Sequence, residues 1–219
     1  MPIADEPTTI PSPPKRVEIE FAGFNGSKGS GKQLFELTDD GHYKLSGEMS
    51  MPVVLFISGS IEQYSEGLIT PSGLQPVTFQ QKTTGSKRQL ANFDWAANRV
   101  TLDTGKRTDV LDLPPGTQDF LSFMYQFMFI PPLDDMRLNI VTGKKLKTYV
   151  YEFEGEESLA SKIGTLRTVH IARTTNDGDE KTELWLAADH RHLPVRIRKT
   201  DKDGAAIDLI ATRLNITEQ

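Results

Sequence analysis

Residues 91–102, ANFDWAANRVTL, contain the pattern that decides the fold. Residues 91–95 and 99–102 each have the composition of a short β-strand. The three residues between them, AAN at 96–98, have the length of a hairpin loop. The stretch therefore predicts two antiparallel strands that are joined by a tight turn.

The same pattern continues toward both ends of the chain. Near the N-terminus, Val17, Ile19 and Phe21 alternate with two glutamates, which is typical of a strand with one buried face. Asn, Asp and Gly recur in the connections between such segments, and these residues adopt turn conformations readily. The further strand-like segments are 34–38, 43–45, 77–80, 137–141, 146–153, 166–172, 182–187, 195–200 and 207–216.

These segments argue against an alternating α/β fold, because parallel strands would need helices between them. We predict a mainly β fold, a strongly curved antiparallel meander sheet that forms a half-open or closed β-barrel and thereby hides its edges. Residues 16–217 are expected to form this single domain. Residues 1–15 contain five prolines and are expected to be a disordered leader.

One segment departs from the strand pattern. The sequence LPPGTQD at 113–119 would end a strand, and Thr117 would then cap a helix with Asp119 near the positive end of its dipole. We expect this helix at about 117–129, before Pro131. Its only polar positions after the cap region form one narrow stripe, so most of its faces must be covered. The stripe consists of Gln118, Ser122 and Gln126. The helix is therefore expected to pack in or over the concave face of the sheet.

The aromatic and methionine side chains of this helix allow two interpretations. They either fill the core, or they form one wall of an apolar pocket, for which flexible methionine beside aromatic rings is well suited. In the second case the ligand would be a lipid, an acyl chain or another apolar molecule. The candidate pocket residues are Phe120, Phe123, Met124, Phe127 and Met128, with Trp95 and Trp185 from the strands.

The composition fits a globular protein and argues against several classes of function. The chain has 219 residues, a formal net charge of −5 and no cysteine. The mild acidic excess argues against a broad nucleic-acid surface, and the lack of cysteine excludes disulfides and thiolate-held metals. No apolar run reaches the roughly 20 residues that cross a bilayer, and residues 1–15 lack the pattern of a signal peptide.

Three groups of residues resemble parts of functional sites. Residues 26–33, GSKGSGKQ, nearly match a phosphate-binding loop, but they end in Gln and lead into a strand, so a hairpin loop fits better. His190 and His192 fit an exposed turn better than a metal site. Three groups of acidic residues fit solvated turns better than a catalytic pair. They are Asp134 with Asp135, the glutamates Glu152, Glu154, Glu156 and Glu157, and the group of Asp177, Asp179 and Glu180. We therefore predict no catalytic residue, no metal, no cofactor and no enzymatic activity.

Arginines near the C-terminus also allow two interpretations. Val195 and Ile197 share one face of their strand, which leaves Arg196 and Arg198 on the other face. With Arg213 they could form a basic stripe for anionic head groups. Alternatively they pair with acidic residues on neighbouring strands, which is the preferred interpretation. The expected acidic partners are Glu183 and Asp208.

Three stretches are characteristic when taken together. They are FDW at 93–95 with the strand that follows, LPPGTQD at 113–119 before the apolar helix, and ELWLAADHRHLPVRI at 183–197. Over most of residues 17–215 the sequence resembles a bacterial family of exported proteins, domain of unknown function 3108. The Trp185 strand with LPVR at 193–196 is also similar to lipoprotein carriers and to a periplasmic sensor domain that regulates a sigma factor, which share a half-open barrel.

The resemblance implies an exported or periplasmic protein without an assigned activity or known catalytic residues. Members of the family usually begin with a signal or anchoring segment, and we expect that segment to have been removed from this chain. The function that we expect is non-enzymatic binding of a lipid, acyl chain or other apolar ligand in the concavity of the sheet. The alternative is an interaction module that docks an envelope protein partner, with the helix as core packing only.

Overall fold

The computed structural model describes residues 12–51, 59–132, 134–174 and 180–219. Within these ranges it contains fifteen β-strands and one short helix, α1 (Ser122–Gln126). The strands are β1 (Arg16–Gly23), β2 (Ser30–Leu37), β3 (His42–Met51), β4 (Gly59–Thr70), β5 (Gly73–Thr83), β6 (Gln89–Asp94), β7 (Arg99–Asp103), β8 (Thr108–Asp112), β9 (Gln118–Asp119), β10 (Met136–Val141), β11 (Leu146–Ser161), β12 (Gly164–Arg173), β13 (Lys181–Ala187), β14 (Leu193–Thr200) and β15 (Ala206–Thr217).

All of these strands belong to one sheet with the order β8-β7-β6-β5-β4-β3-β2-β1-β15-β14-β13-β12-β11-β10-β9. Chain neighbours are mostly sheet neighbours, as in a meander, and β1 pairs with β15 in the middle of the order. The two edges, β8 and β9, do not pair with each other in the described part of the chain. The sheet is therefore curled but not closed, which confirms the predicted mainly β fold in its half-open form.

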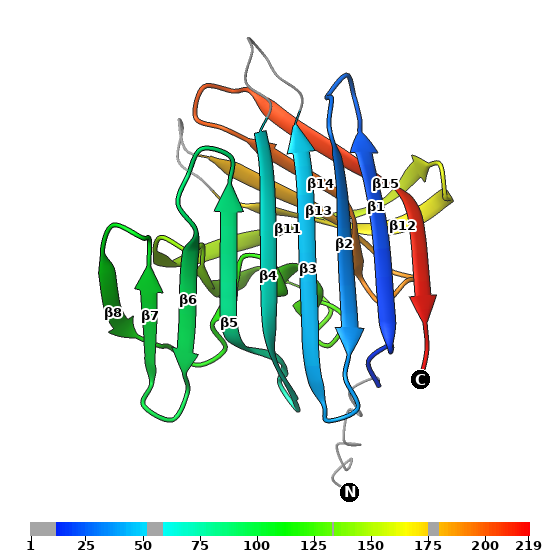
Figure 1. Cartoon of the computed structure of the whole chain (residues 1–219). Helices are drawn as coiled ribbons and strands as arrows, with labels where there is room; N and C mark the ends of the chain where they lie inside the picture. The colour runs from blue at the N-terminus through cyan, green and yellow to red at the C-terminus, as the bar shows by residue number, and fades with distance from the viewer. Residues whose placement is uncertain (1–11, 52–58, 133, 175–179) are drawn as a thin grey trace, which may run out of the picture.

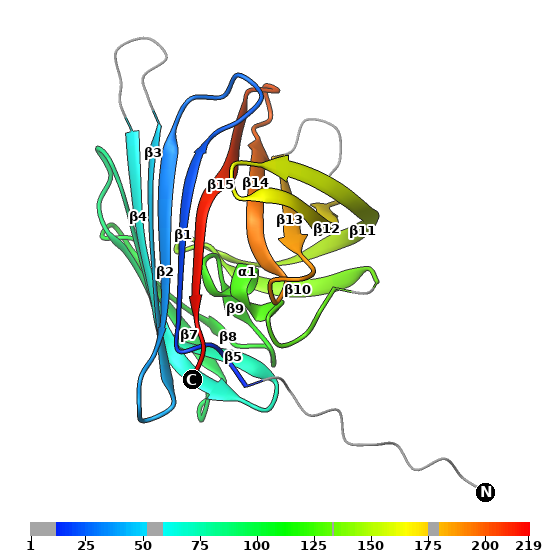
Figure 2. The same ribbon diagram turned by 90° about the vertical axis from the view of Figure 1, so that its right-hand side faces the viewer.

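The curled sheet bends over itself into two layers. Figure 1 shows β1 to β8 side by side in the front layer, with the strands of the C-terminal half crossing behind them. In Figure 2, seen from the side, α1 lies between these layers. This placement confirms that the helix packs in the concave face of the sheet.

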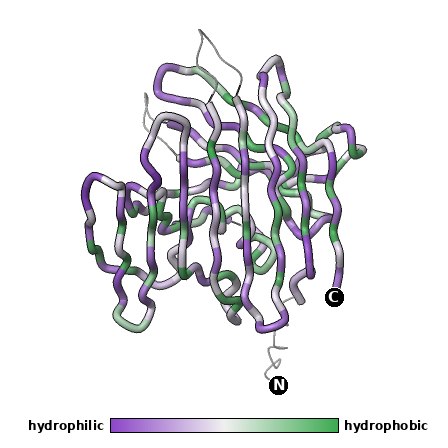
Figure 3. Tube along the Cα trace, viewed as in Figure 1, coloured by the Kyte–Doolittle hydropathy of each residue, from purple (hydrophilic) through white to green (hydrophobic). Residues whose placement is uncertain are grey.

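Period-two alternation explains why these segments form strands. In β1, Val17, Ile19 and Phe21 are buried, while the residues between them are partly exposed. The hydropathy colours in Figure 3 change repeatedly along individual strands in the same way. Strands such as β1 thus give their apolar side chains to the space between the layers and most of their polar side chains to the outer face.

The hairpin predicted from residues 91–102 is present as β6 and β7. Phe93 lies opposite Val100 in the antiparallel register, and the Asp94 carboxylate accepts a hydrogen bond of 2.9 Å from the Ala97 N–H in the turn. Asn98 adopts a positive φ of 52°, a conformation that Asn tolerates better than most residues. The other predicted segments also fall in strands, but the sequence patterns do not predict β4, β8 or β9.

The helix prediction needs correction. The helix covers only Ser122–Gln126 rather than 117–129, because Gln118 and Asp119 are extended and form β9, which pairs in parallel with β10. Thr117 does not cap the helix, since its hydroxyl donates to the Pro114 carbonyl. The N-cap residue of α1 is Leu121, which makes no side-chain cap. Asp119 holds the turn before the helix, because its Oδ1 accepts 2.8 Å hydrogen bonds from the N–H groups of Leu121 and Ser122.

The N-terminal residues that the structure describes lie against the folded domain. The N–H of Lys15 donates to the Thr217 carbonyl and the carbonyl of Lys15 accepts from Leu37, so these residues continue the β1 pairing. Residues 1–11 of the predicted leader lie outside the described ranges. Among the described residues, α1 is far too short to cross a membrane, and no other helix is present that could do so.

Candidate functional site

The apolar segment around α1 fills the space between the layers. Phe120 is half-buried and tilts against Phe123, whose ring also contacts Tyr151 of β11, with centroids 5.7 and 5.6 Å apart. The structure therefore brings the five predicted helical pocket residues together, but as tightly packed side chains. The side chains of this segment that are at most 5 % exposed are Leu121, Phe123, Met124, Tyr125, Phe127, Met128 and Phe129.

The two tryptophans of the predicted pocket lie elsewhere. Trp95, just after β6, stacks on Phe93 and donates from Nε1 to the Pro76 carbonyl at 2.7 Å. Trp185 points to the opposite face of β13 from Leu184 and Leu186, and the side chains stacked on it come from strands of its own layer. The role of these seven residues in holding a ligand stays a prediction.

The polar stripe of the helix segment anchors it to the start of β5. Gln118 Nε2 donates to the Leu74 carbonyl at 2.7 Å. Gln126 donates to the Ser72 carbonyl and accepts from the Leu74 N–H, both at 2.7 Å. A side chain on Gly73, where φ is +91°, would collide with the Gln126 amide. The segment is therefore held in place by three hydrogen bonds made by two side-chain amides and is part of the core.

Asp119, whose side chain is a carboxyl group, lies at the start of this segment and is completely buried. Besides its two backbone hydrogen bonds, it accepts one of 2.5 Å from the Ser65 hydroxyl, which in turn contacts the Tyr43 hydroxyl at 3.0 Å. Burial raises the pKa of Asp119 to about 6, against the opposing effect of these hydrogen bonds. The carboxyl group positions the turn into α1.

A row of glutamines crosses the concave face of the front layer next to α1. Gln33, Gly47, Gln63, Gln81 and Gln89 lie opposite one another in the registers of five consecutive strands. We call these five residues the glutamine row. Within it, Gln63 Nε2 donates to Gln81 Oε1 at 2.8 Å, and Gln81 Nε2 approaches Gln89 Oε1 at 3.4 Å.

The glutamine row marks the boundary of the packed core. The Tyr125 hydroxyl of α1 donates to Gln33 Oε1 at 3.1 Å, and a side chain at Gly47 would press on Leu121. On the other side of the row, the next residues on the same face are only half-buried, including Met49 and Ile61, which pair with each other. The concave face thus changes from a filled apolar core to a partly exposed surface at this row.

Several amide atoms of the row have no partner in the described part of the chain. They are Gln33 Nε2, Gln63 Oε1 and Gln89 Nε2, although each of these residues is at most 6 % exposed. The three atoms still touch solvent-accessible space, since the fully buried unpaired side-chain atoms in the described ranges are Gln118 Oε1, His170 Nε2 and Arg198 Nε. The row therefore offers free donors and acceptors to a molecule that enters the concavity.

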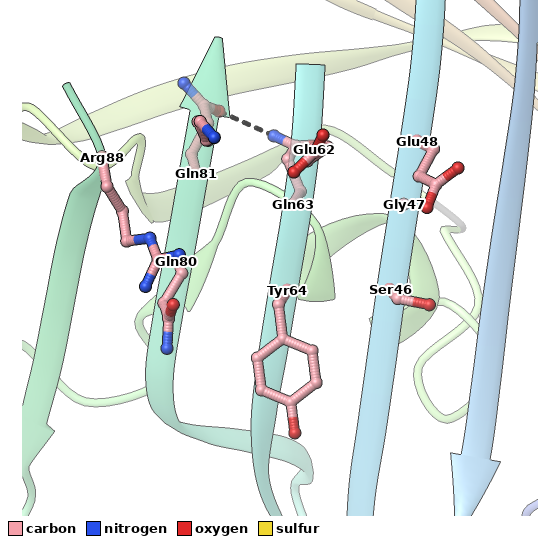
Figure 4. Close-up of a pocket in the computed structure, with 10 residues that line it drawn as sticks. Ser46, Gly47, Glu48, Glu62, Gln63, Tyr64, Gln80, Gln81 and Arg88 are labelled. Carbon is pink, nitrogen blue, oxygen red and sulfur yellow. Dashed lines mark hydrogen bonds between the residues drawn. The ribbon is translucent and has the colours of Figure 1, made fainter. Parts of the chain in front are cut away.

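The outer face of the same strands is different in character. Figure 4 shows Ser46, Tyr64 and Gln80 around a depression of about 220 Å³, with the Gln63–Gln81 amide pair joined behind them. Arg88 and a charged row that pairs Glu48, Glu62 and Lys82 in register complete its walls. Mixed charges over a solvated strand face are ordinary for a soluble sheet, so this depression is a weaker candidate site.

The other sequence motifs that the structure describes lie in or beside connections between strands. Residues 26–33 form the β1–β2 connection and the start of β2, which confirms the hairpin interpretation. His190 and His192 lie in the β13–β14 turn, and no cluster of three metal-ligating side chains occurs in the described ranges. Asp177 and Asp179 lie outside those ranges. The edge strand β8 carries Val110, which is 59 % exposed. The alternative role as an interaction module that docks an envelope partner stays a prediction.

The arginines of the C-terminal half are paired, as the preferred interpretation predicts. Arg196 makes a bidentate ion pair with Asp208, with distances of 2.9 and 2.7 Å, and Arg213 lies 3.6 Å from Glu20. The sequence patterns do not predict the aromatic column around Arg196. Its guanidinium lies over the rings of Trp185 and Phe24, 3.9 and 4.8 Å from their centroids. His170 stacks on Trp185 with centroids 4.1 Å apart. Only the strand register, which is not local, could have shown this column.

Comparison with family models assigns the chain to a protein family. Residues 17–210 match the model of a family described as protein of unknown function (DUF3108). The chain belongs to the DUF3108 family. A comparison with curated proteins gave no match.

One solved structure supports the fold of this DUF3108 protein, and two others are less similar to it. A β-barrel-like protein of domain of unknown function DUF1849 from Brucella abortus shares 10 % identity over 95 % of this chain and all of its own, with a TM-score of 0.59. Two further structures are more distant. The MucA/MucB complex of Pseudomonas aeruginosa shares 15 % identity, with 92 % of this chain and 51 % of that chain covered and a TM-score of 0.37. A putative lipoprotein from Parabacteroides distasonis shares 12 % identity, with 94 % of this chain and 97 % of that chain covered and a TM-score of 0.36. At these identities only the β-barrel-like fold of the first is informative.

Proposed function

We propose that this DUF3108 protein is a non-enzymatic binding protein of the cell envelope that holds an amphipathic ligand, such as a lipid, against its concave face. The observation that carries the proposal is the set of unpaired amide atoms in the glutamine row, beside half-buried apolar side chains. The exported location rests on the resemblance of the sequence to an exported family.

Unpaired amide groups inside a protein favour a ligand that completes them. A buried polar group without a partner costs about 1–3 kcal/mol, and the cost is removed when water or a ligand supplies the hydrogen bond. Gln33 and Gln89 each have a free N–H, which suits the carbonyl oxygen of an ester or amide. Gln63 has a free carbonyl, which suits a hydroxyl group. The row therefore selects an uncharged polar linkage.

The residues beyond the row suit the apolar part of such a ligand. Met49 is flexible and only half-buried, and Ile61 lies beside it. Burial of apolar chain atoms contributes about 0.8 kcal/mol for each methylene group, so a few groups are enough for measurable affinity. In this arrangement Leu121 and Tyr125 of the packed core border the site. The predicted residues Phe123, Met124 and Phe127 belong to the same core.

Native mass spectrometry of the full chain, exported by its host and purified without detergent, tests whether a ligand is retained. Titration with a fluorescently labelled lysophospholipid then measures affinity. We expect Gln63→Met with Gln89→Met to weaken binding about tenfold, since two hydrogen-bonding groups are lost while the side-chain volume is kept.

The matched control is Gln80→Met, because Gln80 lies on β5 next to Gln81 and points to the outer face. This control should bind the lysophospholipid as the native protein does. The proposal would be contradicted if the purified protein carries no ligand and also does not bind the labelled lysophospholipid. Equal weakening by Gln80→Met and by the double variant would contradict it as well.

A further inference from the structure

A second cavity lies away from the glutamine row, where the β1–β2 connection meets β14 and β15. Its volume is about 300 Å³. The sequence GSKG of the near-match to a phosphate-binding loop begins at its rim. The residues that line it are Asn25, Gly26, Ser27, Arg198, Ala206 and Asp208.

The one carboxylate in this cavity already has its counterion. Both oxygens of Asp208 accept hydrogen bonds from Arg196, at 2.9 and 2.7 Å, and the pair is almost fully buried. Arg196 itself is fixed between the rings of Trp185 and Phe24. Because this ion pair is closed and rigid, Asp208 adds little negative potential to the cavity.

The loop wall presents hydrogen-bond donors. The Ser27 hydroxyl accepts a hydrogen bond of 3.1 Å from the Asp208 N–H, so its own proton is directed elsewhere. The N–H groups of Asn25 and Gly26 donate to no group in the described part of the chain. Both residues have positive φ, 49° and 79°, and the loop is tied down by a 2.9 Å hydrogen bond from Phe24 N to the Asp208 carbonyl.

Arg198 gives the cavity its positive charge, which a long ion pair with Glu183 offsets only in part. Its guanidinium makes no hydrogen bond in the described ranges, and its Nε is buried without a partner. The carboxylate nearest to it, Glu183, is 3.9 Å away. That carboxylate is shared with Lys181 at 3.3 Å and with His170 at 3.5 Å. The donors of Arg198 are thus still available to a ligand.

We propose that this cavity binds a phosphate group, either free phosphate or the phosphate of a lipid headgroup. Arg198 supplies the charge, and the Ser27 hydroxyl with the Asn25 and Gly26 N–H groups supplies donors around a tetrahedral oxyanion. Guanidinium and backbone N–H groups are the usual partners of phosphate oxygens. The site is separate from the glutamine row and does not depend on the function proposed for that row.

The test is a titration of the full chain with inorganic phosphate, followed by NMR of the backbone amides. We expect saturable shifts at Gly26 and Ser27. Arg198→Gln should weaken the affinity about tenfold or more, because a charge-assisted contact is lost. Arg213→Gln is the matched control, since Arg213 is an exposed arginine on β15 that pairs with Glu20 outside the cavity.

Two further titrations identify the source of the phosphate. Vesicles of phosphatidylglycerol that compete with inorganic phosphate, while phosphatidylcholine vesicles do not, would assign the site to an anionic lipid headgroup. Binding of inorganic phosphate alone would assign it to the free ion. Acetate that binds as tightly as phosphate, no saturable shift with either phosphate source, or equal losses in the Arg198 and Arg213 variants would overturn the proposal.

Discussion

At the scale of single residues, Asp119 has the largest expected effect on how stability depends on pH. Its carboxyl is completely buried, and its pKa is raised from 3.8 to about 6. The unfolded chain therefore loses this proton at a lower pH than the folded chain does. Between about pH 4 and pH 6 the folded state binds more protons, so its stability falls as the pH rises. A shift of this size corresponds to about 3 kcal/mol.

Asp119→Asn should remove this dependence. The amide Oδ1 can still accept from Leu121 and Ser122, and its Nδ2 can donate to Ser65, so the turn is kept. Urea unfolding at pH 4, 5 and 7 measures the effect, and we expect a flatter profile for the variant. Asp112→Asn, at an exposed ion pair with Arg99, should retain the native profile. An unchanged pH dependence in Asp119→Asn would show that other groups cause it.

At the scale of elements, α1 shows what a sequence pattern can and cannot predict. The density of apolar side chains before Pro131 correctly predicts a covered segment in the concave face. Its length is overpredicted, because the extended Gln118 and Asp119 form a parallel pair with β10, more than twenty residues later in the chain. Local capping rules cannot foresee a strand partner that distant.

The attachment of α1 to β5 gives a prediction for Gln126. Gln126→Ala removes both the donor to Ser72 and the acceptor for the Leu74 N–H, so we expect a loss of about 2 kcal/mol in the free energy of unfolding. Amide hydrogen exchange at Leu74 should also become faster. Gln80→Ala, on the outer face of the same strand, is the control. Unchanged protection of the Leu74 amide would rule out this attachment.

The glutamine row belongs to the same scale and was out of reach of the sequence patterns. Gln33, Gln63, Gln81 and Gln89 have no regular spacing in the chain. They lie side by side only because the registers of four consecutive antiparallel strand pairs place them opposite one another. Alternation predicts which face of a strand a residue occupies, but the register between strands depends on turn geometry and on core packing. The same reasoning applies to the column of His170, Trp185 and Arg196.

At the scale of the whole molecule, the pairing of β1 with β15 joins the two layers. β15 has β1 on one side and β14 on the other, so the last strand connects the front layer to the C-terminal half. The layers also share the side chains packed around α1, including the tilted pair of Phe123 and Tyr151. Neither layer can bury its inner face alone, so we expect residues 16–217 to fold as a single domain.

This arrangement predicts that the protein unfolds in one cooperative step. Trp95 follows β6 in the front layer, whereas Trp185 lies in β13 in the C-terminal half, so each reports on a different layer. In urea, the fluorescence of Trp95 in a Trp185→Phe variant should change together with the far-ultraviolet circular dichroism of that same variant. The same agreement is expected for Trp185 fluorescence in Trp95→Phe.

The comparison is made within each variant because loss of the stacked Trp185 will itself lower stability. If one tryptophan reports unfolding at a urea concentration at which most of the dichroism remains, the two layers unfold separately. The single domain would then have to be replaced by two units joined at β1 and β15.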